Sequence, residues 1–355
     1  MTERMPRAAT VTHPTGTPDR RGARRLPPIA TLSIAAGLLV LVALASLAIG
    51  TRQVPLDVVF GAFASPVAGD ADQVVVRDLR LPRAVIGIMA GAALGVVAAL
   101  LQGATRNPLA DPGLLGINAG ASLAVVAAIA FLGVASPFGF IWFAFGGAAV
   151  AAAVVFAIGS TGGAGATPAK LALTGAALTA ATTPLVTLLL ISDEGTLSQF
   201  RFWSVGSLSG RGLETAAVLW PFLVAGLVLA AWLAGRLNLL ALGDDVARGL
   251  GVRLATTRVV TAVAVIILAG TATSLAGPIA LLGLAVAHAA RGLVGGDYRW
   301  ITPLAGVLGA IVLLAADVIG RVVVAPAELE AGIVAAIVGA PVLIALVRRT
   351  KGTSL

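Results

Sequence analysis

The feature that most constrains this chain is a series of long stretches without a single Asp, Glu, Lys or Arg. The longest, between Asp111 and Lys170, runs for 58 residues. A helix that spans the hydrocarbon core of a membrane needs about 20 consecutive apolar residues, so this stretch is long enough for two. Charged residues make up 11% of the chain, against about 25% in soluble domains. We therefore predict an all-α, polytopic membrane protein without a large soluble catalytic domain.

The charge-free stretches predict ten transmembrane helices. A turn at residues 136–139 separates two of them. Gly277-Pro278 separates another two, because proline removes a helix donor and restricts the residue before it. The expected helices cover residues 29–50, 84–103, 114–134, 138–159, 171–191, 215–235, 258–276, 279–291, 301–323 and 331–347.

Basic residues decide between nine and ten helices. Nine would place the basic C-terminal tail outside, against the positive-inside bias of membrane proteins. With ten helices, 17 of the 24 Lys and Arg residues are cytoplasmic. We predict a multi-pass protein of the inner or plasma membrane with both termini in the cytoplasm. It has a basic tail at 1–28, one transmembrane domain at 29–350 and a short tail at 351–355. The apolar stretch at 29–50 exceeds that of a cleaved signal peptide.

Residues that could carry catalysis are scarce. The chain has no Cys and only two His, which leaves little for a metal site. The glycine-rich segment at 159–165 lacks the Gly-Lys-Ser/Thr of a phosphate loop. Asp244-Asp245 resembles a carboxylate pair but lies in a polar loop, where a solvated or capping role is expected. We expect no enzymatic activity, no cofactor and no metal. The positive charges sit at the ends of apolar runs, so we also expect no nucleic-acid partner.

The expected helices hold almost no ionisable residues. Asp317 and Arg321, in the expected helix at 301–323, are the exception. Their i, i+4 spacing lets them form an ion pair on one helix face. Ion-coupled secondary transporters depend on such groups, so this class stays open but is weakly supported. A transporter with few coupling groups and no nucleotide site needs a partner ATPase.

The loop at 237–258 fits such a partner. Val246, Ala247 and Leu250 fall on one apolar side of a short expected helix. Asp244 is expected to cap its N-terminus, and Gly249 or Gly251 to end it. A helix of this kind lies on the membrane or docks in a groove of another protein, and composition alone leaves both open.

Several ordered motifs follow each other along the chain. They are Arg80-Leu81-Pro82-Arg83, Thr105-Arg106-Asn107-Pro108-Leu109-Ala110-Asp111-Pro112-Gly113, Arg201-Phe202-Trp203, Gly277-Pro278-Ile279, Gly296-Asp297-Tyr298-Arg299-Trp300 and Ala316-Asp317-Val318-Ile319-Gly320-Arg321. These motifs closely resemble the FecCD family, the permeases of ABC importers for iron–siderophores, haem and vitamin B12. The resemblance covers residues 30–350 and is most detailed for ferric-enterobactin-type permeases.

The resemblance implies a type II ABC importer permease with ten helices. It implies a second permease subunit, identical or paralogous, two cytoplasmic ATP-binding subunits and an extracytoplasmic siderophore-binding protein. A ferric siderophore is the implied substrate, with haem or vitamin B12 as the alternative. The implied coupling helix near 242–251 contains Leu242, Gly243, Asp244, Asp245, Ala247, Arg248, Leu250 and Gly251. The implied docking residues for the binding protein are Arg80, Arg83 and Arg321.

A helix break at Asn107-Pro108 is expected inside the protein, because a non-helical backbone cannot face lipid unsatisfied. Gln102 and Asn107 are candidates to satisfy the freed groups. The residues expected at this break or along the pathway are Gln102, Asn107, Pro108 and Asn118. Two departures from the family stand out: Ala287 replaces a common proline before His288, and Glu330 is expected to add an acidic group near Arg321.

Overall fold

The computed structural model describes residues 26–67, 69–159, 161 and 168–351, and this part of the chain forms helices and turns without a strand. Each of the ten ranges expected from the sequence overlaps one helix. Within this described part of the chain, seven helices are long and apolar enough to cross a membrane. They are α1 (Pro28–Ala48), α4 (Leu81–Thr105), α6 (Pro137–Gly159), α7 (Pro168–Ser192), α9 (Leu213–Ala241), α11 (Leu254–Ala276) and α13 (Tyr298–Val323).

Three further helices are α5 (Ile117–Leu132), α12 (Leu282–Val294) and α14 (Ala331–Lys351). The apolar parts described for them are shorter. The all-α membrane architecture is therefore confirmed, while ten crossings stay a prediction.

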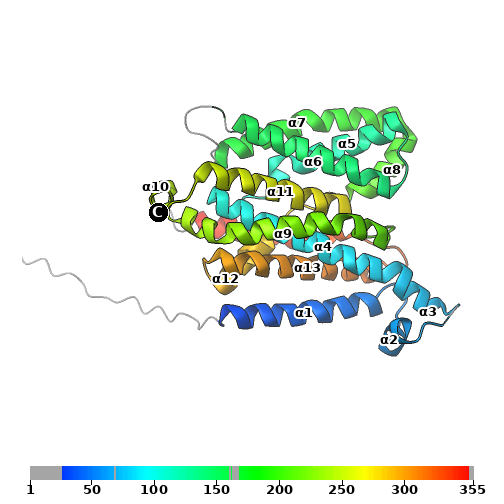
Figure 1. Ribbon diagram of the computed structural model, residues 1–355. Helices are drawn as coiled ribbons and strands as arrows, with labels where there is room; N and C mark the ends of the chain where they lie inside the picture. Colours follow the sequence, from blue (N-terminus) through cyan, green and yellow to red (C-terminus); the bar gives the residue numbers. More distant parts are fainter. Residues whose placement is uncertain (1–25, 68, 160, 162–167, 352–355) are drawn as a thin grey trace, which may run out of the picture.

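The long helices lie side by side, so the molecule has two ends (Figure 1). At one end lie the start of α1, the short helix α10 (Asp244–Gly249) and the C-terminal end of the chain. We call this the α10 end. At the other lie α2 (Leu56–Ala64), α3 (Ala71–Val74) and α8 (Glu194–Ser204), and we call it the α8 end.

Helix α4 is the centre of the bundle, and 83% of its most apolar 18-residue stretch is buried inside the protein. It packs closely on α13, where Gly91 faces Gly309 and Gly95 faces Ala305. A Cβ atom on Gly95 would overlap the carbonyl oxygen of Ala305. Small residues allow such close approach between membrane helices, where van der Waals contact provides much of the association energy. Helix α7 is the least buried of these long helices, since only 11% of its most apolar 18-residue stretch is buried.

The expected range 84–103 is too short for the helix that contains α4. A continuous helical segment runs from Ala71 to Thr105, through α3 and a π-helical turn, η1 (Val75–Arg80). Charges at residues 77–83 interrupt the apolar run, although Arg80 and Arg83 are buried. Helix α9 likewise continues beyond 235, to Ala241, and Arg236 lies over the ring of Trp232 on the same helix.

The break predicted at Gly277-Pro278 is confirmed. Helix α11 ends at Ala276, and Gly277 has φ +76°, a conformation that favours glycine. Leu281 also has a positive φ of 66°. Helix α12 therefore starts at Leu282, three residues later than expected.

Candidate functional site

Helix α10 is anchored through its first residue, Asp244. The carboxylate bridges two arginines: it pairs with Arg106, which follows α4, and its Oδ2 lies 2.7 Å from Nη2 of Arg258 on α11. The expectation that Asp244 caps the helix is wrong, because Gly243 with φ +107° occupies the cap position. Gly251, with φ +84°, turns the chain after α10.

The apolar side of this loop differs from the one expected. Ala247 is fully buried, so it faces the protein instead of sharing a surface with Val246 and Leu250. Leu242, Val246 and Leu250 are instead exposed, by 60%, 49% and 57%. Val246 and Leu250, spaced four residues apart, lie on one side of α10, whereas Leu242 ends α9 and precedes Gly243. Asp245 and Arg248 form an ion pair of 2.7 Å that is open to solvent. The exposed surface of α10 therefore combines an apolar pair with an ion pair.

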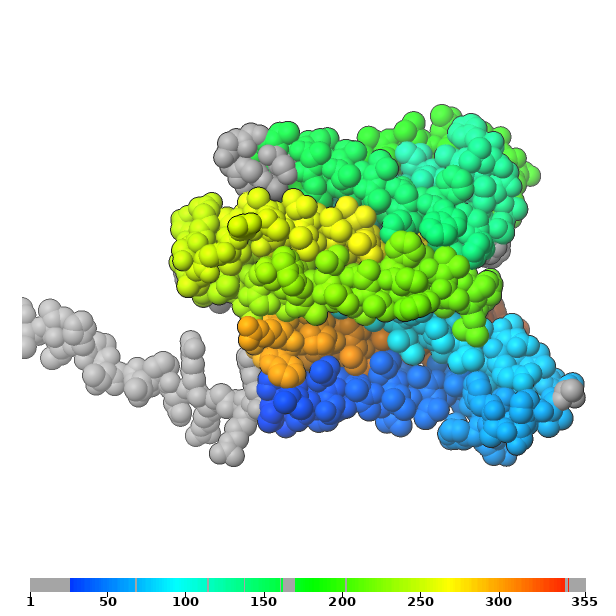
Figure 2. Space-filling model, in the orientation of Figure 1, coloured from blue at the N-terminus to red at the C-terminus, as the bar shows by residue number. Residues whose placement is uncertain are grey.

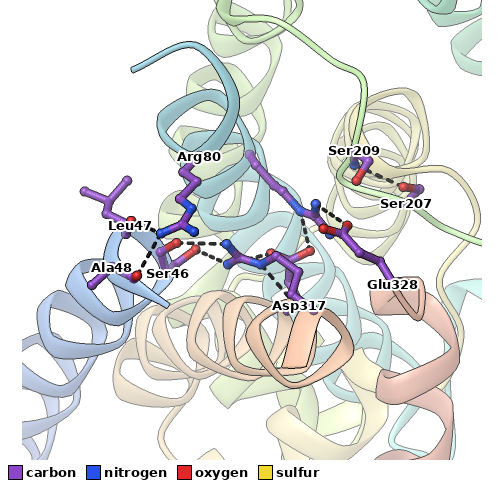
Figure 3. A network of polar contacts seen from close by, with 10 residues as sticks. Ser46, Leu47, Ala48, Arg80, Ser207, Ser209, Asp317 and Glu328 are labelled. Atoms are coloured by element: carbon purple, nitrogen blue, oxygen red, sulfur yellow. Dashed lines mark hydrogen bonds and ion pairs between the residues drawn. The ribbon is translucent and has the colours of Figure 1, made fainter. Parts of the chain in front are cut away.

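The expected docking arginines meet in one buried network at the α8 end (Figure 3). Arg83 Nε lies 2.7 Å from Asp317 Oδ1, and Arg83 Nη1 lies 2.7 Å from Glu328 Oε2. Arg321 Nη2 lies 3.0 Å from the other oxygen of Asp317, which confirms that Asp317 and Arg321 pair. Three arginines and two carboxylates leave this cluster with a formal charge of one positive unit.

Two of these arginines also hold the last turn of α1. Arg80 donates to the carbonyl oxygens of Leu47 and Ala48, both at 2.7 Å, and to that of Arg52. Arg321 donates to Ser46, at 3.0 Å from its carbonyl oxygen and 2.8 Å from its Oγ. The last carbonyls of a helix have no partner within the helix and carry its partial negative charge, so cationic donors stabilise them.

The cluster is buried but not sealed. Arg80, Arg83, Arg321 and Glu328 line a pocket of about 300 Å³. The acidic partners of Arg83 are Asp317 and Glu328, and it is Glu328 rather than Glu330 that also acts electrostatically on Arg321, against the expectation. Glu330 lines a separate pocket of about 350 Å³ with Trp203 and Arg211.

Arg211 is a half-buried residue that the sequence did not single out. Its Nη1 donates to the carbonyl oxygens of Ser274, at 2.5 Å, and Leu275, so it caps the end of α11. Burial lowers the pKa of Arg211 to about 10. Glu328 was missed as well. In both cases the charge lies between apolar runs, where the sequence pattern does not reveal which groups it contacts.

The helix break after α4 is confirmed. Arg106 has φ 51° and ends the helix, and Asn107 then forms a local turn in which its Oδ1 accepts from the backbone N–H of Leu109 at 2.9 Å. Asp111 Oδ1 accepts from the N–H of Gly113 at 2.9 Å. Asp111 lies between α4 and α5 and is buried, and burial raises the pKa of its carboxyl to about 6. Pro108 lies within the turn and is half-buried.

Gln102 does not satisfy this break, contrary to expectation. Its side chain is buried in α4, and neither atom of its amide group has a hydrogen-bond partner among the described residues. Asn118 lies in α5, and its Oδ1 accepts from Thr273 Oγ1 at 3.4 Å. Asn118 thus links α5 to α11.

Known proteins share this architecture. The FecCD transport family model matches residues 38–349. The ferric enterobactin transport system permease protein FepD of Escherichia coli (strain K12) is 47% identical, over 89% of this chain and 95% of that protein. The Fe(3+)-citrate import system permease protein YfmD of Bacillus subtilis (strain 168) is 40% identical, over 80% of this chain and 84% of that protein.

A solved metal-chelate type ABC transporter in an inward-facing conformation has a TM-score of 0.78 and 28% identity. The match covers 90% of this chain and 99% of that one. The family match, the identity to transport permeases and the shared fold lead to one conclusion: the chain belongs to the FecCD transport family and is a multi-pass membrane permease.

Proposed function

We propose that this protein is the permease subunit of an ATP-driven ABC importer for ferric siderophores, with its α10 end in the cytoplasm. The 47% identity to a ferric enterobactin permease supports the substrate class. The positive-inside bias supports the orientation, because α10 lies at the end where basic residues predominate. Haem and vitamin B12 remain the alternative substrates.

The observation that carries the proposal is the exposed apolar side of α10. Val246 and Leu250 protrude from α10, which Asp244 fixes to the ends of α4 and α11, and Leu242 is exposed just before this helix. An apolar helix face presented on a fixed support suits a groove on another protein. In this proposal the groove belongs to the ATP-binding subunit, and movement of α10 passes directly to α4 and α11 through Arg106 and Arg258.

The test replaces this face with charge. Val246→Glu and Leu250→Glu should each reduce co-purification of the ATP-binding subunit and uptake of the ferric siderophore, because a carboxylate would be buried without a partner. Gly296→Glu is the matched control: it adds the same charge at the α10 end, in a loop where nothing lies within 4 Å of the added Cβ. Normal assembly and uptake in both α10 variants would refute the docking role.

Arg80, Arg83 and Arg321 are proposed to receive the binding protein at the α8 end. They line the pocket of about 300 Å³, which is wide enough for an acidic side chain of a partner to reach the positively charged cluster. Net positive charge around the pocket attracts an acidic surface and speeds its encounter with the permease. Replacing Arg83 with Gln removes one positive charge and should therefore slow association of the purified binding protein at low salt. An unchanged rate and salt dependence would argue against docking.

The second permease subunit is proposed to cover α7, whose apolar surface is the least buried in the bundle. The pathway would then run between the two subunits, near Gln102, Asn107, Pro108 and Asn118. Transport by the reconstituted complex distinguishes the mechanisms. Uptake into proteoliposomes that needs ATP supports an ABC importer, whereas uptake by this chain alone under an ion gradient would show a secondary transporter.

A further inference from the structure

One face of α9 is shaped to lie against lipid. Trp220, Val224, Val228 and Trp232 are all exposed and follow each other at four-residue spacing. Helix α9 lies on the face turned toward the viewer in Figures 1 and 2, and no other helix covers it there. Tryptophan at both ends of an apolar stripe is typical of membrane interfaces, where the indole ring has both an apolar body and a polar N–H.

A groove of about 420 Å³ lies next to this stripe, between α9, α4 and α13. Its walls are almost entirely small or aliphatic side chains, so it can accept a flexible hydrocarbon chain. Along α13 it runs from residue 299 to 307, about 12 Å at 1.5 Å per residue. The lining residues from α9 and α4 include Ala230, Ala231, Ala234, Ala92 and Val96.

The polar groups are at one end of the groove. Arg299 lies at the end nearest α10, and its guanidinium lies 3.7 Å from the position that a Cβ atom on Gly235 would take. Arg236 is the next residue, and its side chain lies over the ring of Trp232. Neither arginine forms an ion pair with a described residue. The nearby Asp297 uses Oδ1 to accept from Asn238 and from the N–H of Arg299. Arg236 Nη1 donates to the carbonyl oxygen of Trp232 at 2.9 Å, so the remaining N–H groups of Arg236 and the guanidinium of Arg299 are available to an anion.

Thr302 adds a second polar group, deeper in the groove than Arg299. It lines the groove one helical turn further in than Arg299, and its buried Oγ1 has no hydrogen-bond partner among the described residues. A buried hydroxyl without a partner is costly. An ester carbonyl of a lipid, which lies between phosphate and acyl chain, could accept from it.

We infer that this groove binds an anionic phospholipid such as phosphatidylglycerol. Its phosphate lies at Arg299 and Arg236, an ester carbonyl at Thr302 and one acyl chain in the groove. The order of groups along the groove matches the order of groups in the lipid. Basic pockets between membrane helices commonly hold anionic headgroups. The site is separate from α10 and from the cluster around Asp317, so it does not depend on the proposed transport function.

The experiment is native mass spectrometry of the full-length protein, purified in detergent, with added phosphatidylglycerol or phosphatidylcholine of identical acyl chains. We expect wild type to retain phosphatidylglycerol at lower concentration than phosphatidylcholine. Arg299→Gln and Arg236→Gln should each weaken phosphatidylglycerol about fivefold and leave phosphatidylcholine unchanged. Arg253→Gln, an exposed arginine at the same end but outside the groove, is the matched control.

Two variants test the rest of the groove. Ala231→Phe should fill it and weaken both lipids, and Thr302→Val should weaken both by removing the hydroxyl. Equal retention of the two lipids by wild type would overturn the inference. So would a double variant, Arg299→Gln with Arg236→Gln, that keeps the preference for phosphatidylglycerol. Displacement of the bound lipid by soluble glycerophosphate at equal concentration would also overturn it, because it would show a phosphate site without a role for the acyl chain.

Discussion

Replacing Asp317 with Asn tests whether the buried cluster at the α8 end holds the bundle together. Asp317 is fully buried and its two oxygens face Arg83 and Arg321, at 2.7 and 3.0 Å. Removing one partner of a buried ion pair costs about 3–5 kcal/mol, because the remaining charge stays buried without compensation. Arg83 would keep Glu328, and Arg321 would keep Ser46. We therefore expect the lower value, about 3 kcal/mol.

The assay is thermal unfolding of the purified protein in detergent. At about 2.1 cal/mol/K per residue over 355 residues, a loss of about 3 kcal/mol lowers Tm by about 4 °C. Glu328→Gln is the matched control: the Glu328 side chain is 34% exposed, so its loss should cost about 1 kcal/mol at most. Asp317→Asn should also raise protease sensitivity at the end of α1, because Arg321, which donates to Ser46 there, would lose its carboxylate partner. A Tm as high as that of Glu328→Gln would refute the reasoning.

Three more predictions concern the core, the helix break and α10. Gly95→Leu should abolish a monodisperse peak in gel filtration, since any Cβ there meets the α13 backbone, whereas Gly37→Leu in α1 has nothing within 4 Å and should be tolerated; a folded Gly95→Leu protein would contradict the packing of α4 on α13. The pKa of Asp111, raised to about 6 by burial, means that its ionised form destabilises the fold as pH rises from about 4 to 6. Asp111→Asn should therefore gain Tm relative to wild type across that range and hold the gain at pH 7.5, and a pH-independent difference would exclude this titration. Asp244→Ala should free Arg106 and Arg258 and lower the siderophore transported per ATP hydrolysed, and an unchanged ratio would show that the bridge does not transmit coupling.

Apolar periodicity and the placement of charge determined most of the architecture without any tertiary information. A charge-free run such as the 58 residues after Asp111 has one stable arrangement in lipid, because every backbone group must be bonded within the segment. The breaks at Gly277 and after Thr105 were equally local, since they depend on proline and glycine geometry. Helices α2 and α8 were missed because they are short and lie beside the spans rather than within them.

The tertiary structure alone decided which way each side chain of the candidate sites faces. From the sequence, Ala247 belongs with Val246 and Leu250, yet it is buried by the neighbouring helices while they are exposed. The sequence shows Asp317 four residues from Arg321, but Arg83 and Glu328 join them from segments far away along the chain. Gln102 was expected to serve the helix break and instead lies in the core with its amide unpaired. Local rules determine where a helix begins and ends, whereas its rotation, and so the partners of every charged residue, follows from packing the whole bundle at once.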